Sequence, residues 1–123
     1  MTTKQMVGEI REEMNASLVS PRRWYVGVSR NARASLFESH RVRENGDRWI
    51  YLPACSAADA DNVLSYFQKS WFWRADVAPL NGAGDAVEIY AFLKEAHTNP
   101  GTALDMPNHV CAMSLDQIGR RVA

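Results

Sequence analysis

The clearest β-strand signal in this chain of 123 residues is Val87-Glu88-Ile89-Tyr90-Ala91-Phe92-Leu93, in which Glu88 is the only charged residue. Two further runs of β-branched and aromatic residues predict strands at 24–28 and 49–52, the second stopped by Pro53. A last short strand is expected at 109–113, and a turn-rich loop at 72–86. These runs predict a small mixed or antiparallel sheet of three or four strands.

Helical patterns lie before and between the strands. At 3–19, apolar residues recur every four positions, with Thr3 as the expected cap and Pro21 as the stop. The apolar positions are Met6, Ile10, Met14 and Leu18. A short helix is expected at 31–40, with Leu36 and Phe37 facing inward.

A third helix is expected to begin after Ser56, with Asp59 three residues on as in a capping box, and to reach about Ser70. Its apolar stripe consists of Ala60, Val63, Leu64, Phe67 and Trp71. A turn of helix capped by Ser114 is expected to end at Arg120-Arg121.

About three helices packed on such a sheet form an α+β fold, an α/β sandwich, in a single domain over 1–123. We expect an N-terminal amphipathic helix at 3–19, a core at 22–93 and a C-terminal extension at 94–123. No run approaches the roughly 20 apolar residues that span a bilayer, and the N-terminus lacks the apolar segment of a signal peptide. We therefore expect a cytoplasmic protein with no membrane partner.

The net charge of zero conceals a segregation of charge along the chain. Residues 22–48 carry a net charge of +4, and residues 49–119 carry −5. Every base of the first stretch is an arginine, whose planar guanidinium binds phosphate with two hydrogen bonds. The expected nucleic-acid contacts are Arg22, Arg23, Arg30, Arg33, Arg41 and Arg43, with Trp24, Tyr25 and Trp49 as stacking partners. A solvated face paired with the acidic half of the molecule is the alternative.

The segment Trp24-Tyr25-Val26-Gly27-Val28-Ser29, followed by Arg33 and His40, resembles the second half of the GIY-YIG nuclease signature. The resemblance covers about 24–70, because the strand at 49–51 and the helix after Ser56 also follow the family pattern. It implies that Tyr25 helps to activate water, that Arg33 stabilises the transferred phosphate and that His40 closes the helix of the motif. In the family, a glutamate on the later helix holds one divalent metal.

Three departures from the family pattern bear on activity. The first strand of the signature has no match before Trp24, the stretch 25–40 is one residue out of register, and the metal glutamate falls on or beside Leu64. A leucine supplies no oxygen ligand for a hard cation. We therefore expect a catalytically degenerate nuclease-like domain without a cofactor, in which Tyr25, Arg33 and His40 are inactive.

Such a domain acts by binding either nucleic acid or a nucleic-acid-processing protein. In the second case it resembles small phage or mobile-element inhibitors, and the acidic residues of 49–119 form its surface. Two other classes of function stay open. One is a Mg²⁺-dependent GIY-YIG-type endonuclease whose metal ligand is relocated to Asp59, Asp61 or Glu38. The other is an oligomeric structural module, a homodimer formed through 3–19.

Overall fold

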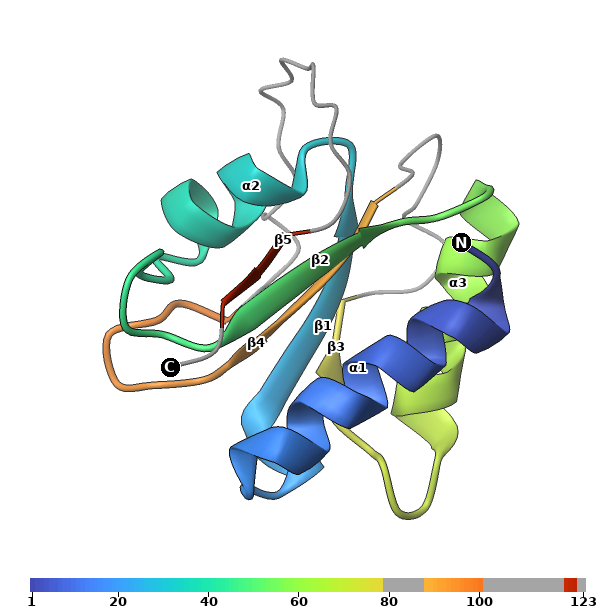
Figure 1. Ribbon diagram of the computed structural model, residues 1–123, viewed down its shortest axis with the longest axis horizontal. Coiled ribbons are helices and arrows are strands. Elements are labelled where there is room, and N and C mark those ends of the chain that lie inside the picture. The colour runs from blue at the N-terminus through green and yellow to red at the C-terminus, as the bar shows by residue number, and fades with distance from the viewer. Residues whose placement is uncertain (79–87, 101–118, 122–123) are drawn as a thin grey trace.

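A mixed sheet of five strands, in the order β3-β1-β4-β2-β5, forms the centre of the computed structural model. The structure describes residues 1–78, 88–100 and 119–121. The strands are β1 (Trp24–Ser29), β2 (Trp49–Pro53), β3 (Asp76–Val77), β4 (Glu88–Leu93) and β5 (Gly119–Arg121). The long strand β4 is antiparallel to β1 on one side and to β2 on the other, whereas β3 runs parallel to β1. The predicted α+β class is confirmed (Figure 1).

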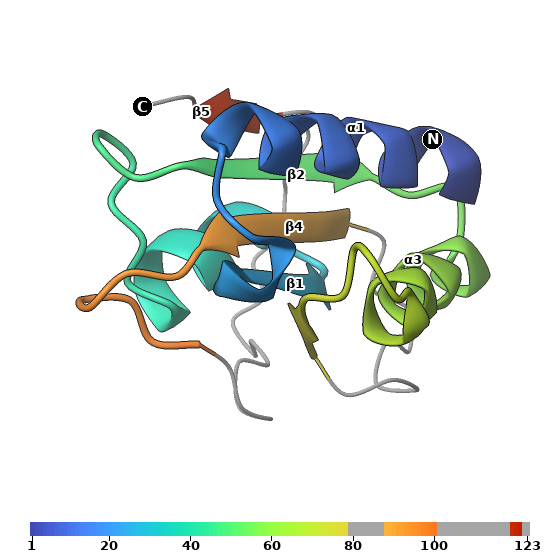
Figure 2. The same cartoon turned by 90° about the horizontal axis from the view of Figure 1, so that it is seen from below.

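Helices cover both faces of this sheet. The two long helices, α1 (Thr3–Ser17) and α3 (Ala57–Lys69), lie on one face. On the other face, α2 (Ala32–Ala34) continues into the π-helical turn η2 (Ser35–Ser39), and together they form the helix expected at 31–40. A single 3-10 turn, η1 (Pro21–Arg23), leads into β1. Figure 2 shows the long helices and α2 on opposite sides of the strands.

Two separate cores follow from this arrangement, because successive strand residues point to opposite faces. Towards α1 and α3 lie the sheet residues Trp24, Val26, Ile50, Leu52, Ile89 and Ala91. Towards α2 and η2 lie Tyr25, Trp49, Tyr51, Tyr90 and Phe92. Since both faces are covered, the strands read as continuous apolar runs rather than as alternating ones.

Side-chain hydrogen bonds set the helix ends. Thr2, rather than the expected Thr3, caps α1: its hydroxyl accepts from the Gln5 N–H, and the Gln5 carboxamide accepts from the Thr2 N–H at 2.9 Å. The helix ends at Ser17, two residues early, because Leu18 adopts the left-handed conformation with φ 60°. The third helix is capped as predicted, with the Ser56 hydroxyl accepting from the Asp59 N–H at 3.1 Å.

The apolar stripes are buried within the chain except at Leu18, which is 91% exposed just beyond the end of α1, and at Trp71. Met6 and Met14 are fully buried against the sheet, so the apolar face of α1 is not exposed for an oligomer. A homodimer through 3–19 stays a prediction, and it would use the polar face of the helix. On α3 the stripe is buried as expected up to Phe67, but Trp71 lies beyond the helix end and is 88% exposed.

Two expectations for short elements differ from the structure. β3 lies inside the segment expected to be a loop, and its two residues are too few to show a strand pattern. β5 occupies the place of the helical turn expected to end at Arg120-Arg121, because its backbone pairs with the edge of β2. It also brings part of the C-terminal extension into the sheet. The strand expected at 109–113 and the Ser114 cap lie outside the described residues. Among the helices that the structure describes, none is long and apolar enough to cross a membrane.

One side-chain contact ties the start of α1 to the start of α3 and predicts a pH dependence. The Thr3 hydroxyl donates to the Asp59 carboxylate at 2.6 Å. This bond lowers the pKa of Asp59, with a smaller lowering from the Ser56 hydroxyl. A lowered folded-state pKa stabilises the fold above the ordinary pKa of aspartate, about 4, and this contribution is lost as the pH falls through the folded value.

We therefore expect Thr3→Val to lower the free energy of unfolding near neutral pH, with a difference from the wild type that shrinks as the pH falls below about 4. Urea unfolding at a series of pH values measures this. In an Asp59→Asn background the pH dependence of the difference should disappear. A difference that is independent of pH in the wild-type background would show that the bond does not act through the carboxylate.

Candidate nucleic-acid interface

Two of the three residues carried over from the nuclease signature meet in the core on the α2 side of the sheet. Tyr25 lies near the start of β1 and is 3% exposed. Its ring centroid lies 5.0 Å from that of His40 and 5.4 Å from that of Phe92. Tyr25 and His40 are thus neighbours, and they face packed side chains rather than solvent.

Both ring nitrogens of His40 have hydrogen-bond partners. Nδ1 lies 2.7 Å from the carbonyl oxygen of Asn99, which can only accept, so Nδ1 carries a proton. Nε2 lies 2.7 Å from the Tyr90 hydroxyl, which can either donate to this nitrogen or accept from it. The Asn99 N–H also donates to the His40 carbonyl at 2.7 Å. His40 therefore fastens the segment after β4 to the end of η2.

Gly27 makes room for the Tyr90 ring that reaches His40. The register places Gly27 directly opposite Tyr90. A Cβ at Gly27 would lie 2.5 Å from the Tyr90 hydroxyl oxygen and the carbon that bears it, far inside van der Waals contact. No sequence pattern identifies Tyr90 as the partner of His40, although a glycine inside a strand is a known sign of close approach.

Arg33 lies away from this pair, on the solvent side of α2. Its guanidinium lies over the ring of Phe37, 5.2 Å from the centroid, and bonds the Glu44 carboxylate at 3.3 Å. The Tyr51 hydroxyl, followed by Glu44, raises the pKa of Arg33 above its ordinary value. The structure therefore does not bring the arginine of the signature to the tyrosine.

The position expected for the metal glutamate also belongs to the core. Leu64 is fully buried on the apolar stripe of α3. Within residues 1–78, 88–100 and 119–121, no group of three His, Cys, Asp or Glu side chains is placed to hold a metal ion.

The prediction that Trp24, Tyr25 and Trp49 stack on nucleic-acid bases is wrong. Trp24, Tyr25 and Trp49 are 0%, 3% and 5% exposed, because a sheet covered on both faces buries the aromatic residues of both. Trp49 packs edge-on against Phe37, and its indole N–H donates to the Glu44 carbonyl at 3.2 Å.

Basic residues gather instead at one end of the sheet, where β1, β2 and β3 begin and β4 ends (Figure 1). We call this group the basic end; it comprises Arg22, Arg23, Arg41, Arg43, Arg48, Arg74 and Lys94. The backbone holds it together: the Lys94 N–H donates to the Arg23 carbonyl at 2.8 Å, and the Leu93 N–H donates to the Arg48 carbonyl at 3.1 Å. This group is not apparent from the sequence, because its members come from four separate stretches of the chain.

Two members of the basic end are neutralised by carboxylates. Arg48 pairs with Glu13 of α1 at 3.0 Å, with the two side chains 13% and 4% exposed. Lys94 pairs with Asp76 of β3. The remaining members are exposed, and their guanidinium groups form no ion pair with the described part of the chain. They are Arg22, Arg23, Arg41, Arg43 and Arg74.

Local structure presents these arginines to solvent. The Ser20 hydroxyl accepts from the Arg22 N–H at 3.2 Å, and Pro21 fits the first position of the 3-10 turn that carries Arg22 and Arg23. Arg41 has φ 62°, a left-handed conformation that costs a residue with a Cβ about 1–2 kcal/mol. Its neighbours His40 and Val42 are both buried, which leaves Arg41 pointing outward.

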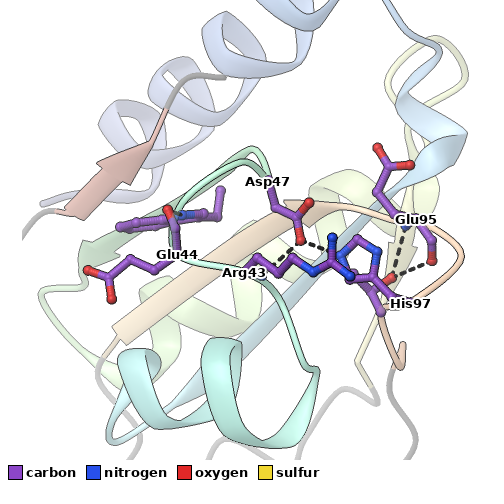
Figure 3. A network of polar contacts seen from close by, with 7 residues as sticks. Arg43, Glu44, Asp47, Glu95 and His97 are labelled. Atoms are coloured by element: carbon purple, nitrogen blue, oxygen red, sulfur yellow. Dashed lines mark hydrogen bonds and ion pairs between the residues drawn. The ribbon is translucent and has the colours of Figure 1, made fainter.

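A polar network holds the loop that carries Arg43 against the segment after β4 (Figure 3). The Asp47 carboxylate accepts from the Arg43 N–H at 2.8 Å and lies 2.6 Å from Nε2 of His97. Gly46, with φ 112°, makes the turn that points Asp47 back at Arg43. Next to His97, the Glu95 N–H donates to the Thr98 hydroxyl at 2.9 Å.

The six arginines expected to bind nucleic acid therefore do not form one patch. Arg30 follows the far end of β1, one strand length from Arg23, and the Arg33 guanidinium is paired with Glu44. Four of the six belong to the basic end. Arg74 also belongs to the basic end but was not among the six expected arginines. The acidic half is also dispersed within the described residues: Asp59 bonds Thr3, Asp76 bonds Lys94, and buried Glu88 accepts from the Ala32 N–H at 2.7 Å.

Comparison of the chain with protein-family models, with curated proteins and with solved structures gave no match.

The close approach at Gly27 predicts a large effect of one methyl group. We expect Gly27→Ala to lower the free energy of unfolding by about 1–3 kcal/mol, the usual cost of overpacking, because the Tyr90 ring must leave its place against His40. Chemical unfolding measures this. In a Tyr90→Leu background the same substitution should cost clearly less, since neighbouring sites are coupled. An equal loss in both backgrounds would contradict the assignment.

Proposed function

We propose that this chain is a nucleic-acid-binding domain that acts through the basic end, as a catalytically degenerate relative of nuclease-like domains. The observation that carries the proposal is a set of five exposed arginines at one end of the sheet, none of which forms an ion pair within the described residues. The net charge of the chain is zero, so attraction to a polyanion depends on this local concentration.

The spacing of the basic end suits a row of phosphates. Neighbouring strands lie about 4.8 Å apart, so the ends of β3, β1, β4 and β2 span about 14 Å. Arginine rather than lysine supplies every unpaired cation of the group, and its guanidinium matches the phosphate oxygens. Several phosphates can thus be bound at once, and each contact releases counterions.

The strained backbone of Arg41 supports a binding role. A left-handed residue that is not glycine persists only where its surroundings hold it, and such residues cluster at functional sites. Here buried His40 and Val42 hold the conformation, and it places a cation in solvent that the fold itself does not use.

Nucleic acid is a better match than a basic nucleic-acid-processing protein. That alternative needs a free acidic surface, and within the described residues three of the acids of 49–119, Asp59, Asp76 and Glu88, are bound to other groups of the chain. Binding is also better supported than cleavage, since Tyr25 and His40 are buried and Arg33 contacts other groups. The metal-dependent endonuclease is kept as an outcome of the test.

The test is a titration of labelled DNA and RNA over a range of salt concentrations, with and without Mg²⁺. We expect affinity to fall steeply with salt. Arg22→Gln/Arg23→Gln should weaken binding and reduce the slope of log affinity against log salt by about 1.4–1.8, the value for two lost phosphate contacts. Lys4→Glu is the matched control: it changes the net charge by the same amount at an exposed position of α1 outside the basic end.

Failure of the wild-type chain to bind any nucleic acid at low salt would reject the proposal. An equal loss of affinity in Lys4→Glu would show that only net charge matters. Mg²⁺-dependent cleavage that is abolished by Tyr25→Phe would favour the endonuclease instead.

Arg41 offers a second test that separates binding from folding. We expect Arg41→Gly to change the free energy of unfolding by less than about 1 kcal/mol, because relief of the left-handed strain offsets the greater freedom of glycine in the unfolded chain. The same variant should bind nucleic acid more weakly at every salt concentration. Thermal unfolding and the titration above give both quantities, and undiminished affinity would remove Arg41 from the interface.

A further inference from the structure

The loop between α3 and β3 exposes two large aromatic side chains next to each other. Trp71 is 88% exposed and Phe72 is 65% exposed. Each ring leaves apolar surface in water, and its burial against another molecule would be favourable. Figure 1 shows this loop projecting below α3, away from both cores.

The loop is held in this shape at both ends. The Ser70 hydroxyl accepts from the Trp73 N–H at 3.0 Å, and the Ala75 N–H donates to the Phe67 carbonyl at 3.0 Å. Trp73 packs against the core, and its ring lies under the Arg11 guanidinium at 4.8 Å. Phe72 rests edge-on against Trp73, with ring centroids 5.2 Å apart. The exposed rings are therefore presented by an anchored loop.

The exposed rings adjoin the basic end. The parallel register places Asp76 opposite Tyr25, so Arg74 and Arg23 each come two residues before this pair, at the same end of the sheet. Trp71 precedes Arg74 by three residues, a distance of at most about 10 Å along the chain. The two rings and the unpaired guanidinium groups of Arg74, Arg22 and Arg23 thus lie at the same end of the molecule.

We propose that Trp71 and Phe72 stack on unpaired bases of a single-stranded nucleic acid whose phosphates lie on Arg74, Arg22 and Arg23. This inference rests on the proposed function and makes it more specific. Aromatic rings beside a cationic track are the common features of single-strand binding surfaces, because every base has a face that can stack. In a duplex these faces are already stacked on one another, so two solvent-exposed rings favour a single strand.

Leu18 distinguishes base stacking from burial against a protein. It is 91% exposed and lies at the same end of the molecule, since the Trp24 indole N–H bonds the adjacent Ser17 hydroxyl at 3.3 Å. Leucine has no ring to stack on a base. A protein partner covering this end would bury Leu18 with the aromatic residues, whereas a single strand would gain little from it.

The experiment measures fluorescence anisotropy of a labelled single strand of about 20 nucleotides, and of the matching duplex, at several salt concentrations. We expect Trp71→Ala/Phe72→Ala to weaken single-strand binding by about 10- to 100-fold, with an unchanged salt slope because no phosphate contact is lost. Leu18→Ala is the control and should stay within about twofold of the wild type. An unchanged thermal unfolding midpoint shows that each variant folds.

A conservative variant tests the stacking itself. We expect a bound single strand to quench the tryptophan fluorescence of the wild type, because Trp71 is the most exposed of the four tryptophans. Trp71→Phe should lose most of this quenching while keeping most of the affinity, since phenylalanine also stacks.

The binding results for the wild type and the variants test base stacking and the basic end separately. Salt-dependent binding that Trp71→Ala/Phe72→Ala leaves unchanged, or weakens equally for duplex and single strand, would overturn the stacking inference and leave the basic end in place. Absence of binding by the wild type would overturn both. A loss in Leu18→Ala as large as in the aromatic variant would indicate a protein-type contact surface instead.

Discussion

The central strand β4 is enclosed on every side, and the rest of the structure depends on this. It bonds β1 along one edge and β2 along the other, and helices cover both of its faces. A strand enclosed in this way is apolar along most of its length. Its one charged residue is Glu88, whose carboxylate accepts a hydrogen bond from the Ala32 N–H at the start of α2. The one charge in the strand thus secures the helix that covers it.

The covering of the second face explains why the residues of the nuclease-like motif are buried. Gly27 lets the Tyr90 ring cross β1 to reach His40, and His40 in turn holds Asn99. Tyr25 packs into the same group. The tyrosine, glycine and histidine that resemble a catalytic signature are therefore used for packing α2 and the segment after β4 on the sheet. Only Arg33 of the motif reaches solvent, and it pairs with Glu44.

A sheet covered on both faces leaves its ends and edges for contact with other molecules. At one end, backbone pairing aligns residues from four stretches of the chain, so arginines distant in sequence become neighbours. The exposed rings of Trp71 and Phe72 lie at the corner of this end. The binding that we propose thus uses strand ends and connecting loops, where the fold leaves arginines without an ion pair in the described residues and aromatic rings exposed.

The sequence by itself determined the three long strands, the two long helices and the apolar stripes, because each depends on local periodicity and on caps such as Ser56. Only the tertiary structure decided which aromatic residues are buried, since a covered second face takes Trp49 into the core whereas the end of α3 leaves Trp71 outside. The short strands β3 and β5 also required it, because they exist only through pairing with β1 and β2. The basic end was visible in part as an arginine-rich stretch. The structure adds Arg74 to the basic end and leaves out Arg30 and Arg33. This follows from the strand register, which no local sequence pattern specifies.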